Sequence, residues 1–476
     1  MNNLKITPRT QDFSKWYNDI VSKADLAEHS SVKGCMIIKP YGYAIWEKIQ
    51  QSLDRIIKSK GVKNAYFPLF IPQSFLEKEA EHVEGFNPEL AIVTHGGGKK
   101  LDEPLVVRPT SETIMYDAYS RWIKSYRDLP LLINQWANIV RWEKRPRLFL
   151  RTTEFLWQEG HTAHATAEQA QEFTIDMLNM YASFAEDFLA MPVKKGRKPQ
   201  FDKFAGALDT YSIEAMMQDG KALQAGTSHN LGTNFASAFN IQYLDEDNKL
   251  QLVHQTSWGV STRLMGGIIM VHSDDQGLRL PPNIAPIQVV IVPIYKTDDE
   301  EHKIMQIAEQ IKKDLTKFSV HIDNDSKKSP GWKFNEWEQK GVPIRIEIGP
   351  KDLTREEVVL FRRDTGNKEN IDIKNVSKIV PDVLASIQTT LYQQAIEFAE
   401  KNTYSTDDWD EFKKIMDEKS GFIYSHWCGE QKCEDEIKEI TKANIRHIPF
   451  EQREEKGKCV KCGSVCETTV LWAKSY

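Results

Sequence analysis

Apolar residues in the first part of the chain follow helical and strand periods in turn. Those from Ile45 to Ile57 recur at the spacing of one helix face, and Gly61 stands where a helix commonly ends on a left-handed residue. A strand is predicted next, from Ala65 to Ile71, with Pro68 inside it. Because proline has no amide hydrogen to donate to a neighbouring strand, we expect this strand at a sheet edge. It would face either solvent or a subunit partner.

The pattern between Leu132 and Gly160 predicts two strands, Leu132–Glu143 and Phe149–Gly160, joined by a loop over residues 144–148. Side chains alternate between the two faces of a strand. One face of the first strand would therefore carry Arg141 and Glu143. The matching face of the second strand would carry Arg151, Thr153, Phe155, Trp157, Glu159 and His161.

This charged and aromatic face suits a ligand site better than a sheet core, because burying unpaired charges is costly. Arginine offers planar, permanently charged donors to phosphate oxygens. Carboxylates and aromatic rings suit an ammonium group on an apolar body. The alternative is a surface hairpin crossed by salt bridges.

Three further segments place polar residues in apolar surroundings. Thr110 or Ser111 precedes an amphipathic helix and is either a ligand group or the helix N-cap. Thr227 and His229 share one face of a predicted strand, where a structural histidine is equally expected. Arg263 opens an otherwise apolar helix and needs either an anionic ligand or a buried carboxylate partner.

A proline-rich connector at residues 281–286 separates this first part from a second one. There the strand Ile287–Val292, a helix near Glu300–Lys317 and the strands Val320–Ile322 and Ile344–Ile348 follow one another, which is typical of a small α/β domain. A charged, helical and then cysteine-rich segment ends the chain. For a length of 476 residues we predict three domains, over residues 1–280, 287–390 and 391–476.

The composition excludes few functions. An apolar fraction of 40% is ordinary for a globular protein, and no apolar run approaches a membrane span. The N-terminus lacks an apolar signal core, so a cytoplasmic protein is expected. The formal charge of −6 neither requires nor excludes nucleic acid, because phosphates are attracted only over about 8–10 Å. A local basic cluster, which is either such a surface or a solvated loop, consists of Lys194, Lys195, Arg197 and Lys198.

In their order along the chain, these segments resemble the three motifs of class II aminoacyl-tRNA synthetases. The matching stretches are Gly61…Pro68, Arg141-Trp142-Glu143 and Ser261-Thr262-Arg263. The flanking residues are similar to those of prolyl-tRNA synthetases of the archaeal and eukaryotic type. Thr110–Glu112 resembles the proline-recognition loop of that family, and the resemblance extends over Phe149–His161, Gly349–Leu353 and the terminal Tyr476.

The resemblance implies a fold and an activity. The fold would be an α+β catalytic domain with an antiparallel sheet and helices, an α/β anticodon-binding domain and a small α/β zinc-bearing C-terminal domain. The activity would be activation of L-proline with ATP to prolyl-adenylate and transfer to the 3′ end of tRNA(Pro). In-line displacement at the α-phosphate needs no covalent enzyme intermediate, so positioning and charge neutralisation by two arginines and Mg²⁺ would supply most of the rate.

The family's site residues carry over to matching positions of this sequence. Arg141 and Arg263 would be catalytic. The proline site would contain Thr110, Glu112, Arg141, Trp157, Glu159, His161 and His229. The ATP site would contain Arg141, Glu143, Arg151, Thr152 (through its backbone), Gln224, Thr227, Ser261 and Arg263. Anticodon contacts would come from Lys351, Asp352 and Arg363.

The resemblance also implies a homodimer, through motif 1, and the absence of an editing insertion. Fewer than a hundred residues separate Gly160 from Trp258, and they read as part of the active-site domain.

Five of the six cysteines lie near the end of the chain, which in a reduced protein favours a metal over disulfides. The spacing of four of them resembles the structural zinc site of the subgroup, a closed tetrahedral set. These four are Cys428, Cys433, Cys459 and Cys462. Competing ligands are Cys466, His426 and His447, and unliganded thiols are the alternative.

Two other functions stay open. A sister synthetase for threonine or glycine would share the anticodon domain, but a threonine enzyme would be expected to place zinc ligands in its active site, and the catalytic part holds only Cys35. A catalytically inactive tRNA-binding paralogue has no need to keep both Arg141 and Arg263. A hydrolytic metal pair at His161 and His164 lacks a third ligand at a useful spacing.

Overall fold

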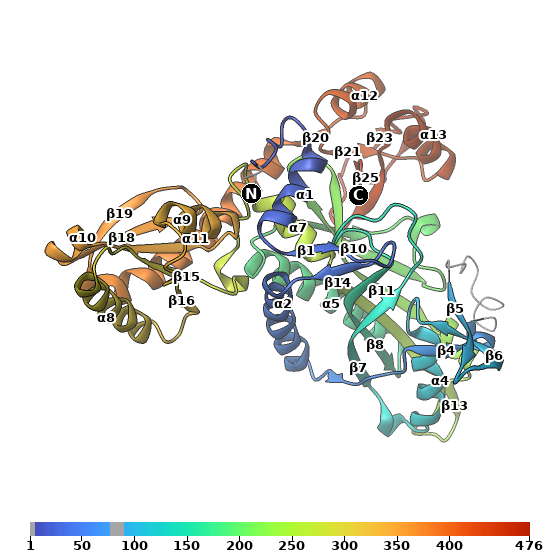
Figure 1. Ribbon diagram of the computed structural model, residues 1–476. Helices are drawn as coiled ribbons and strands as arrows, with labels where there is room; N and C mark the ends of the chain where they lie inside the picture. Colours follow the sequence, from blue (N-terminus) through green and yellow to red (C-terminus); the bar gives the residue numbers. More distant parts are fainter. Residues whose placement is uncertain (1–4, 77–89) are drawn as a thin grey trace.

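The computed structural model describes residues 5–76 and 90–476. It has a central body built on one large sheet, a separate α/β unit on one side and a C-terminal part on another (Figure 1). Residues 1–4 and 77–89 of the predicted first domain lie outside the described residues. In the described part, no helix combines the length and the apolar character that crossing a membrane requires.

The central sheet has eleven strands. In spatial order they are β20 (Thr403–Ser405), β21 (Phe422–His426), β25 (Thr469–Ala473), β22 (Asn444–Pro449), β9 (Val193–Arg197), β10 (Asp209–Met216), β11 (Ala222–Gly232), β14 (His254–Ser261), β8 (Glu154–His164), β7 (Leu131–Val140) and β3 (Lys63–Asn64). From β9 to β7 every neighbouring pair is antiparallel. The predicted antiparallel catalytic sheet is therefore confirmed.

Helices pack against this sheet in two hydrophobic cores. The larger core packs around the fully buried side chains of Trp16, Ile49 and Trp258. A second core surrounds Tyr116 and Phe235. The helices that supply these cores are α1 (Phe13–Lys23), α2 (Pro40–Ser59), α4 (Glu112–Trp122), α5 (Ala167–Asp187), α6 (Asn234–Phe239) and α7 (Arg263–His272).

Helix α2 confirms the predicted helix over the Ile45–Ile57 pattern, and Gly61 follows it with φ +82°. The predicted single strand over residues 65–71 is wrong. Two short strands flank Pro68 instead: β3 pairs in parallel with β7, and β4 (Phe70–Pro72) pairs with another sheet. Proline cannot donate to a ladder, so the chain leaves one sheet before it and joins the next one after it.

That second sheet and two small ribbons lie beside the central one. The three-stranded sheet has the order β4, β6 (Lys99–Val107), β5 (Ala91–Gly96). The ribbons are β1 (Ala27–His29) with β2 (Met36–Ile38), and β12 (Gln242–Leu244) with β13 (Leu250–Leu252).

The predicted hairpin over residues 132–160 forms, but its turn is longer than expected. β7 ends at Val140 and β8 begins at Glu154, so residues 141–153 form a loop. The loop turns at Phe149, whose φ is +62°, and Thr153 donates its amide to the Gly34 carbonyl at 2.8 Å. Backbone partners outside the hairpin thus end the ladder early.

The α/β unit confirms the second predicted domain type. Its five-stranded sheet has the order β16 (Val320–Ile322), β15 (Val289–Pro293), β17 (Ile344–Ile348), β18 (Glu357–Arg362) and β19 (Lys368–Asp372). Its helices are α8 (Asp298–Asp314), α9 (Pro330–Gln339), α10 (Pro350–Thr354) and α11 (Val376–Lys401). The helix predicted near Glu300–Lys317 starts earlier, because Thr297 and Glu300 form a capping box.

The C-terminal part is less separate than the sequence suggests. Helix α11 runs through the predicted boundary at residue 390. After it come α12 (Trp409–Glu418), α13 (Gln431–Thr441) and the ribbon β23 (Gly457–Lys458) with β24 (Val465–Cys466). Strand β22 pairs with β9, so this part extends the catalytic sheet.

Candidate active site and cysteine cluster

A cavity of about 370 Å³ opens over strands β8, β10, β11 and β14 of the central sheet. It brings together eleven residues that the sequence assigned to proline or ATP. These are Thr110, Glu112, Arg141, Trp157, Glu159, His161, Gln224, Thr227, His229, Ser261 and Arg263. The strand alternation explains much of this, since Phe155, Trp157, Glu159 and His161 of β8 all line the cavity.

Two buried carboxylates lie at one side of the cavity. Glu159, 2% exposed, accepts hydrogen bonds from Ser111 Oγ at 2.6 Å, Gln135 Nε2 at 2.8 Å and His161 Nε2 at 3.0 Å. Glu112, 4% exposed, accepts one from the Thr110 hydroxyl. Ser111 is the N-cap residue of α4, as one of the two readings of this segment predicted, but its hydroxyl donates to Glu159 and makes no cap bond.

Two histidines near these carboxylates have pKa values that shift in opposite directions. Burial alone would lower the pKa of His161, but the hydrogen bond with Glu159 and the charge of Glu112 outweigh it and raise that pKa. Burial, with the nearby charge of His161, lowers the pKa of His229 to about 3. His229 is therefore a neutral ring, held by Thr210 Oγ1 at 2.9 Å from its Nδ1.

Two arginines, Arg141 and Arg263, also line the cavity. The guanidinium of Arg141 lies over the rings of Trp157 at 5.5 Å and Phe155 at 5.8 Å, and its Nε donates to the Pro109 carbonyl. Burial lowers the pKa of Arg141, and the negative charges of Glu112 and Glu159 partly offset this shift. Arg263 Nε donates to the Leu150 carbonyl at 3.3 Å.

Arg263 lacks the carboxylate partner that a structural role requires. Among residues 5–76 and 90–476 none lies within ion-pair distance of its guanidinium. Burial and the charges of Arg141 and Arg151 lower the pKa of Arg263 to about 10, so it stays protonated at neutral pH. An unpaired, half-buried guanidinium beside a second one favours an anionic ligand.

Three predicted ATP residues lie outside the cavity lining, in the loop 141–153. Arg151 Nε is 3.6 Å from Glu143 Oε2, and the Arg151 side chain is 55% exposed. The Thr152 hydroxyl donates to the Glu154 carbonyl at 2.7 Å, which leaves its backbone for a ligand contact. These residues were predicted on strands, and the longer turn moves them to the rim.

One side of the cavity consists of residues that were not predicted from the sequence. Its residues follow β9 or begin β10, and they are Lys198, Asp202, Lys203, Phe204 and Thr210. The basic cluster ending at Lys198 was the available signal. Lys198 is 4% exposed, so for this residue the reading as a solvated loop is wrong.

The three predicted anticodon residues have different surroundings in the α/β unit. Lys351 is exposed at the start of α10. Asp352 accepts a hydrogen bond from the Gly349 amide at 2.9 Å and so caps the same helix. Arg363 is 5% exposed and binds both carboxylate oxygens of Asp274, at 2.7 and 2.9 Å. Arg363 therefore joins the α/β unit to the central body.

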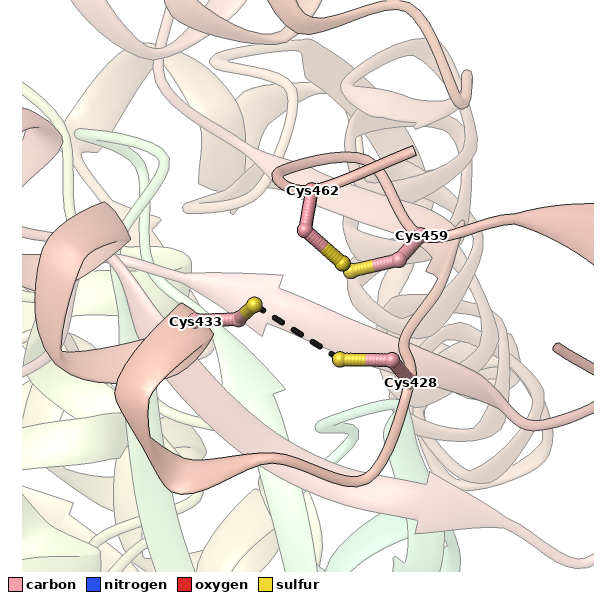
Figure 2. A group of neighbouring side chains, drawn as sticks. All are labelled: Cys428, Cys433, Cys459 and Cys462. Atoms are coloured by element: carbon pink, nitrogen blue, oxygen red, sulfur yellow. Dashed lines mark hydrogen bonds between the residues drawn. The ribbon is translucent and has the colours of Figure 1, made fainter. Parts of the chain in front are cut away.

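Four cysteine thiols converge in the C-terminal part (Figure 2). The Sγ atoms of Cys428, Cys433, Cys459 and Cys462 all lie within 4.8 Å of one another. A tetrahedral zinc site with Zn–S bonds of about 2.3 Å needs sulfur separations of about 3.8 Å, so the cluster fits this ion after a small contraction. His426, a predicted competitor, has both ring nitrogens engaged by Asp407 and the Glu455 carbonyl.

Comparison with known proteins agrees with this arrangement. Residues 95–272 match the tRNA synthetase class II core domain (G, H, P, S and T), and residues 288–382 match an anticodon binding domain. Residues 409–476 match the C-terminal domain of prolyl-tRNA synthetases. These ranges fall inside the three predicted domains, whose boundaries stay predictions.

Similar proteins cover the chain from end to end. A proline--tRNA ligase 2 of Bacillus thuringiensis subsp. konkukian is 54% identical over 99% of this chain and 98% of its own length. A proline--tRNA ligase of Ruminiclostridium cellulolyticum is 56% identical with the same coverage. The crystal structure of prolyl-tRNA synthetase from Cryptosporidium parvum, complexed with halofuginone and AMPPNP, superposes with a TM-score of 0.94 at 42% identity over the whole of both chains. The chain therefore belongs to the prolyl-tRNA synthetases, the class II aminoacyl-tRNA synthetases that ligate proline to tRNA.

Proposed function

We propose that the cavity over the central sheet is where L-proline and ATP react to form prolyl-adenylate, before proline passes to the 3′ end of tRNA(Pro). The observation that carries this proposal is the separation of charge within one cavity. Buried Glu112 and Glu159 face one side, and Arg263 faces the other, with Arg141 close to both groups. One side suits an ammonium group and the other suits phosphates.

Proline would bind at the carboxylate side. Its secondary ammonium is complementary to the buried carboxylates of Glu112 and Glu159, which line this side of the cavity. Aromatic side chains, among them Trp157 and Phe204, would enclose the ring. The remaining proline contacts would come from Thr110, His161 and His229.

ATP would place its α-phosphate between Arg141 and Arg263. As the proline carboxylate attacks, negative charge builds up on the phosphoryl oxygens, and both guanidinium groups are already oriented to stabilise it. Gln224, Thr227 and Ser261 line the same side of the cavity. The rim residues Glu143, Arg151 and Thr152 would complete the nucleotide site from the loop 141–153.

Mg²⁺ would accompany the phosphates of ATP. Of the carboxylates that line the cavity, Glu112 and Glu159 are buried and hydrogen-bonded, whereas the Asp202 side chain is 46% exposed. Asp202 is the residue of this set that fits a hydrated magnesium ion. When bound, the ion would neutralise phosphate charge.

The four clustered cysteines would hold a structural Zn²⁺. The set is closed, with no position left for a substrate, so it would contribute folding energy rather than catalysis.

tRNA would contact the α/β unit through Lys351, whose exposed ammonium can meet a phosphate. Asp352 would shape the helix start beside it. Arg363 would make no direct contact with tRNA, because its guanidinium binds Asp274.

Residues 165–253 form α5, β9–β11 and α6 of the central body, which supports the prediction that the chain has no editing insertion.

A homodimer and a cytoplasmic location stay part of the proposal. Strand β3 ends the large sheet, and beyond it Tyr66 and Phe70 are 72% and 45% exposed. Apolar side chains at a sheet edge suit a second copy of the chain. Translation takes place in the cytoplasm, so the location follows from the activity.

Proline-dependent ATP–pyrophosphate exchange tests the proposal. The purified protein is expected to exchange pyrophosphate far better with proline than with threonine or glycine. Equal or greater activity with threonine would favour the sister synthetase, and no exchange with any amino acid would favour an inactive paralogue.

A further inference from the structure

A buried carboxylate without a role in the proposed reaction lies next to the cavity. Glu214 of β10 is fully buried and accepts hydrogen bonds from Arg446 Nε and Nη2 at 3.0–3.2 Å and from Ser212 Oγ at 3.1 Å. Arg446 belongs to β22 of the C-terminal part. This ion pair therefore joins the C-terminal part to the catalytic sheet.

Lys198 approaches the same carboxylate from the cavity. Its Nζ is 3.5 Å from Glu214 Oε1 and 3.4 Å from Asp202 Oδ2. Both distances exceed the usual 2.7–3.2 Å of such hydrogen bonds. An ammonium group has three donors, so Lys198 keeps donors for a ligand in the cavity that it lines.

Arg446 explains why the Lys198 ammonium stays loosely held. It binds both oxygens of Glu214, whereas Lys198 lies near only one. Burial would raise the pKa of Glu214, but the charges of Arg446, Lys198 and His447 outweigh it and lower that pKa. Glu214 thus binds Arg446 more closely than Lys198, and the Lys198 ammonium stays at 3.4–3.5 Å from both Glu214 and Asp202 at the cavity wall.

We propose that Lys198 binds a phosphate group of a substrate, and that Arg446 is the positioning residue that keeps Lys198 available by occupying both oxygens of Glu214. The phosphate is that of ATP or that of the 3′-terminal nucleotide of tRNA, both of which the proposed function brings to this cavity. Without Arg446, Glu214 is left to Lys198, and the ammonium moves from the cavity to the carboxylate. The inference rests on the proposed function.

A double-mutant cycle with Lys198→Met and Arg446→Met tests this coupling. Each single variant is expected to raise a KM about tenfold, the size of one charge-assisted contact. The KM for ATP, measured in pyrophosphate exchange without tRNA, rises if Lys198 binds a phosphate of ATP. The KM for tRNA, measured in aminoacylation, rises if Lys198 binds the phosphate of the 3′-terminal nucleotide of tRNA. In the Lys198→Met background, Arg446→Met should change that KM by no more than about twofold, although it still lowers the melting temperature.

A purely structural role of Arg446 gives a different pattern. Its effect would then be the same in both backgrounds, and that result would overturn the inference, as would unchanged KM values in Lys198→Met. If Arg446→Met folds poorly, Arg446→Lys takes its place. It keeps one positive charge near Glu214, so its KM should lie between those of the wild type and of Lys198→Met. Arg453→Met is the matched control, because Arg453 lies in the same part but pairs with Asp407. Absent exchange in the wild-type protein would instead overturn the proposed function.

Discussion

Four arginines of this chain differ in their partners. Arg345 and Arg446 are buried and bind carboxylates at hydrogen-bond distances, as structural arginines do. Arg141 and Arg263 line the cavity and donate only to backbone carbonyls among the hydrogen bonds of the described residues. A charge that the protein leaves without a counter-charge is available to a ligand.

Replacing Arg141 tests this distinction. Arg141→Ala should reduce proline-dependent pyrophosphate exchange by at least about 10²-fold, because a lost transition-state contact of this type costs about 2.7–4 kcal/mol. Arg121→Ala is the matched control, since Arg121 is 62% exposed and pairs with Asp117 of its own helix. A melting curve for each variant would show that the fold is kept. Normal exchange in Arg141→Ala would contradict the assignment.

Buried histidines predict an acid limit to stability. Burial is the main cause that lowers the pKa of His164 and of His272 to about 4, and that of His447 to about 3. An unfolded histidine takes up a proton near pH 6.5, but these do not while folded. Because the unfolded state binds more protons, stability is expected to fall as pH decreases from about 6.5 to about 4, by about 1–2 kcal/mol per histidine at pH 5.

Urea unfolding at pH 7.5 and pH 5 measures that loss. His272→Gln keeps a donor for the Leu189 carbonyl and should reduce the difference between the two midpoints. His302→Gln, at an exposed position, is the control. An identical acid loss in His272→Gln would refute the burial of His272 as a cause of the acid sensitivity.

At the scale of single elements, β8 and its turn decide which residues reach the cavity. Alternation along the strand brings Trp157, Glu159 and His161 to one face. The same rule fails for Arg151, because the ladder stops at Glu154. Side chains alternate between the two faces only as far as the strand extends.

The cysteine cluster joins the end of β21 and the start of α13 to the segment around β23 and β24. We expect about one zinc per chain by metal analysis. Cys428→Ser should lower the zinc content and the melting temperature, because metal binding contributes folding energy. Cys35→Ser, far from the cluster in sequence and outside the four thiols, should leave both unchanged. A stable, active, zinc-free wild-type protein would contradict the assignment.

On the scale of the whole molecule, one carboxylate connects the α/β unit to the central body. Asp274 follows α7, the helix that Arg263 begins, and it binds Arg363 and, at 2.9 Å, Arg279 Nε. Burial opposes its ionisation, but the hydrogen bonds and charge of Arg363 outweigh it and lower the pKa of Asp274. The orientation of the tRNA-reading unit is thus tied to the end of an active-site helix.

Arg363→Met and Lys351→Ala should distinguish the structural role of the Arg363–Asp274 ion pair from direct contact with tRNA. Arg363→Met leaves Asp274 with Arg279 alone and is expected to cost about 1–3 kcal/mol of stability. It should also raise the KM for tRNA, because the unit loses its fixed orientation. Lys351→Ala should raise the same KM without changing the melting temperature. Both variants should keep pyrophosphate exchange near normal, and a parallel loss of exchange would show that the unit supports the catalytic fold.

The sequence, through its local patterns and the resemblance of its motifs, predicted the three kinds of domain and the antiparallel catalytic sheet, and it selected Arg141 and Arg263, which line one cavity. Apolar periods, proline positions and the order of the motifs are properties of the local sequence, so they can be recognised without knowing which distant residues pack against them. For the same reason the sequence predicted the four cysteines, whose spacing is short within each pair.

Only the tertiary structure decided how these parts meet. It ended β7 at Val140 through backbone partners elsewhere in the chain, and it buried Lys198 beside Glu214 and committed Arg363 to Asp274. It also joined β22 to β9, so that the last part of the chain completes the first sheet. Each of these contacts links residues distant in sequence, and the partner of a charge or of a sheet edge is not encoded in the local pattern around it.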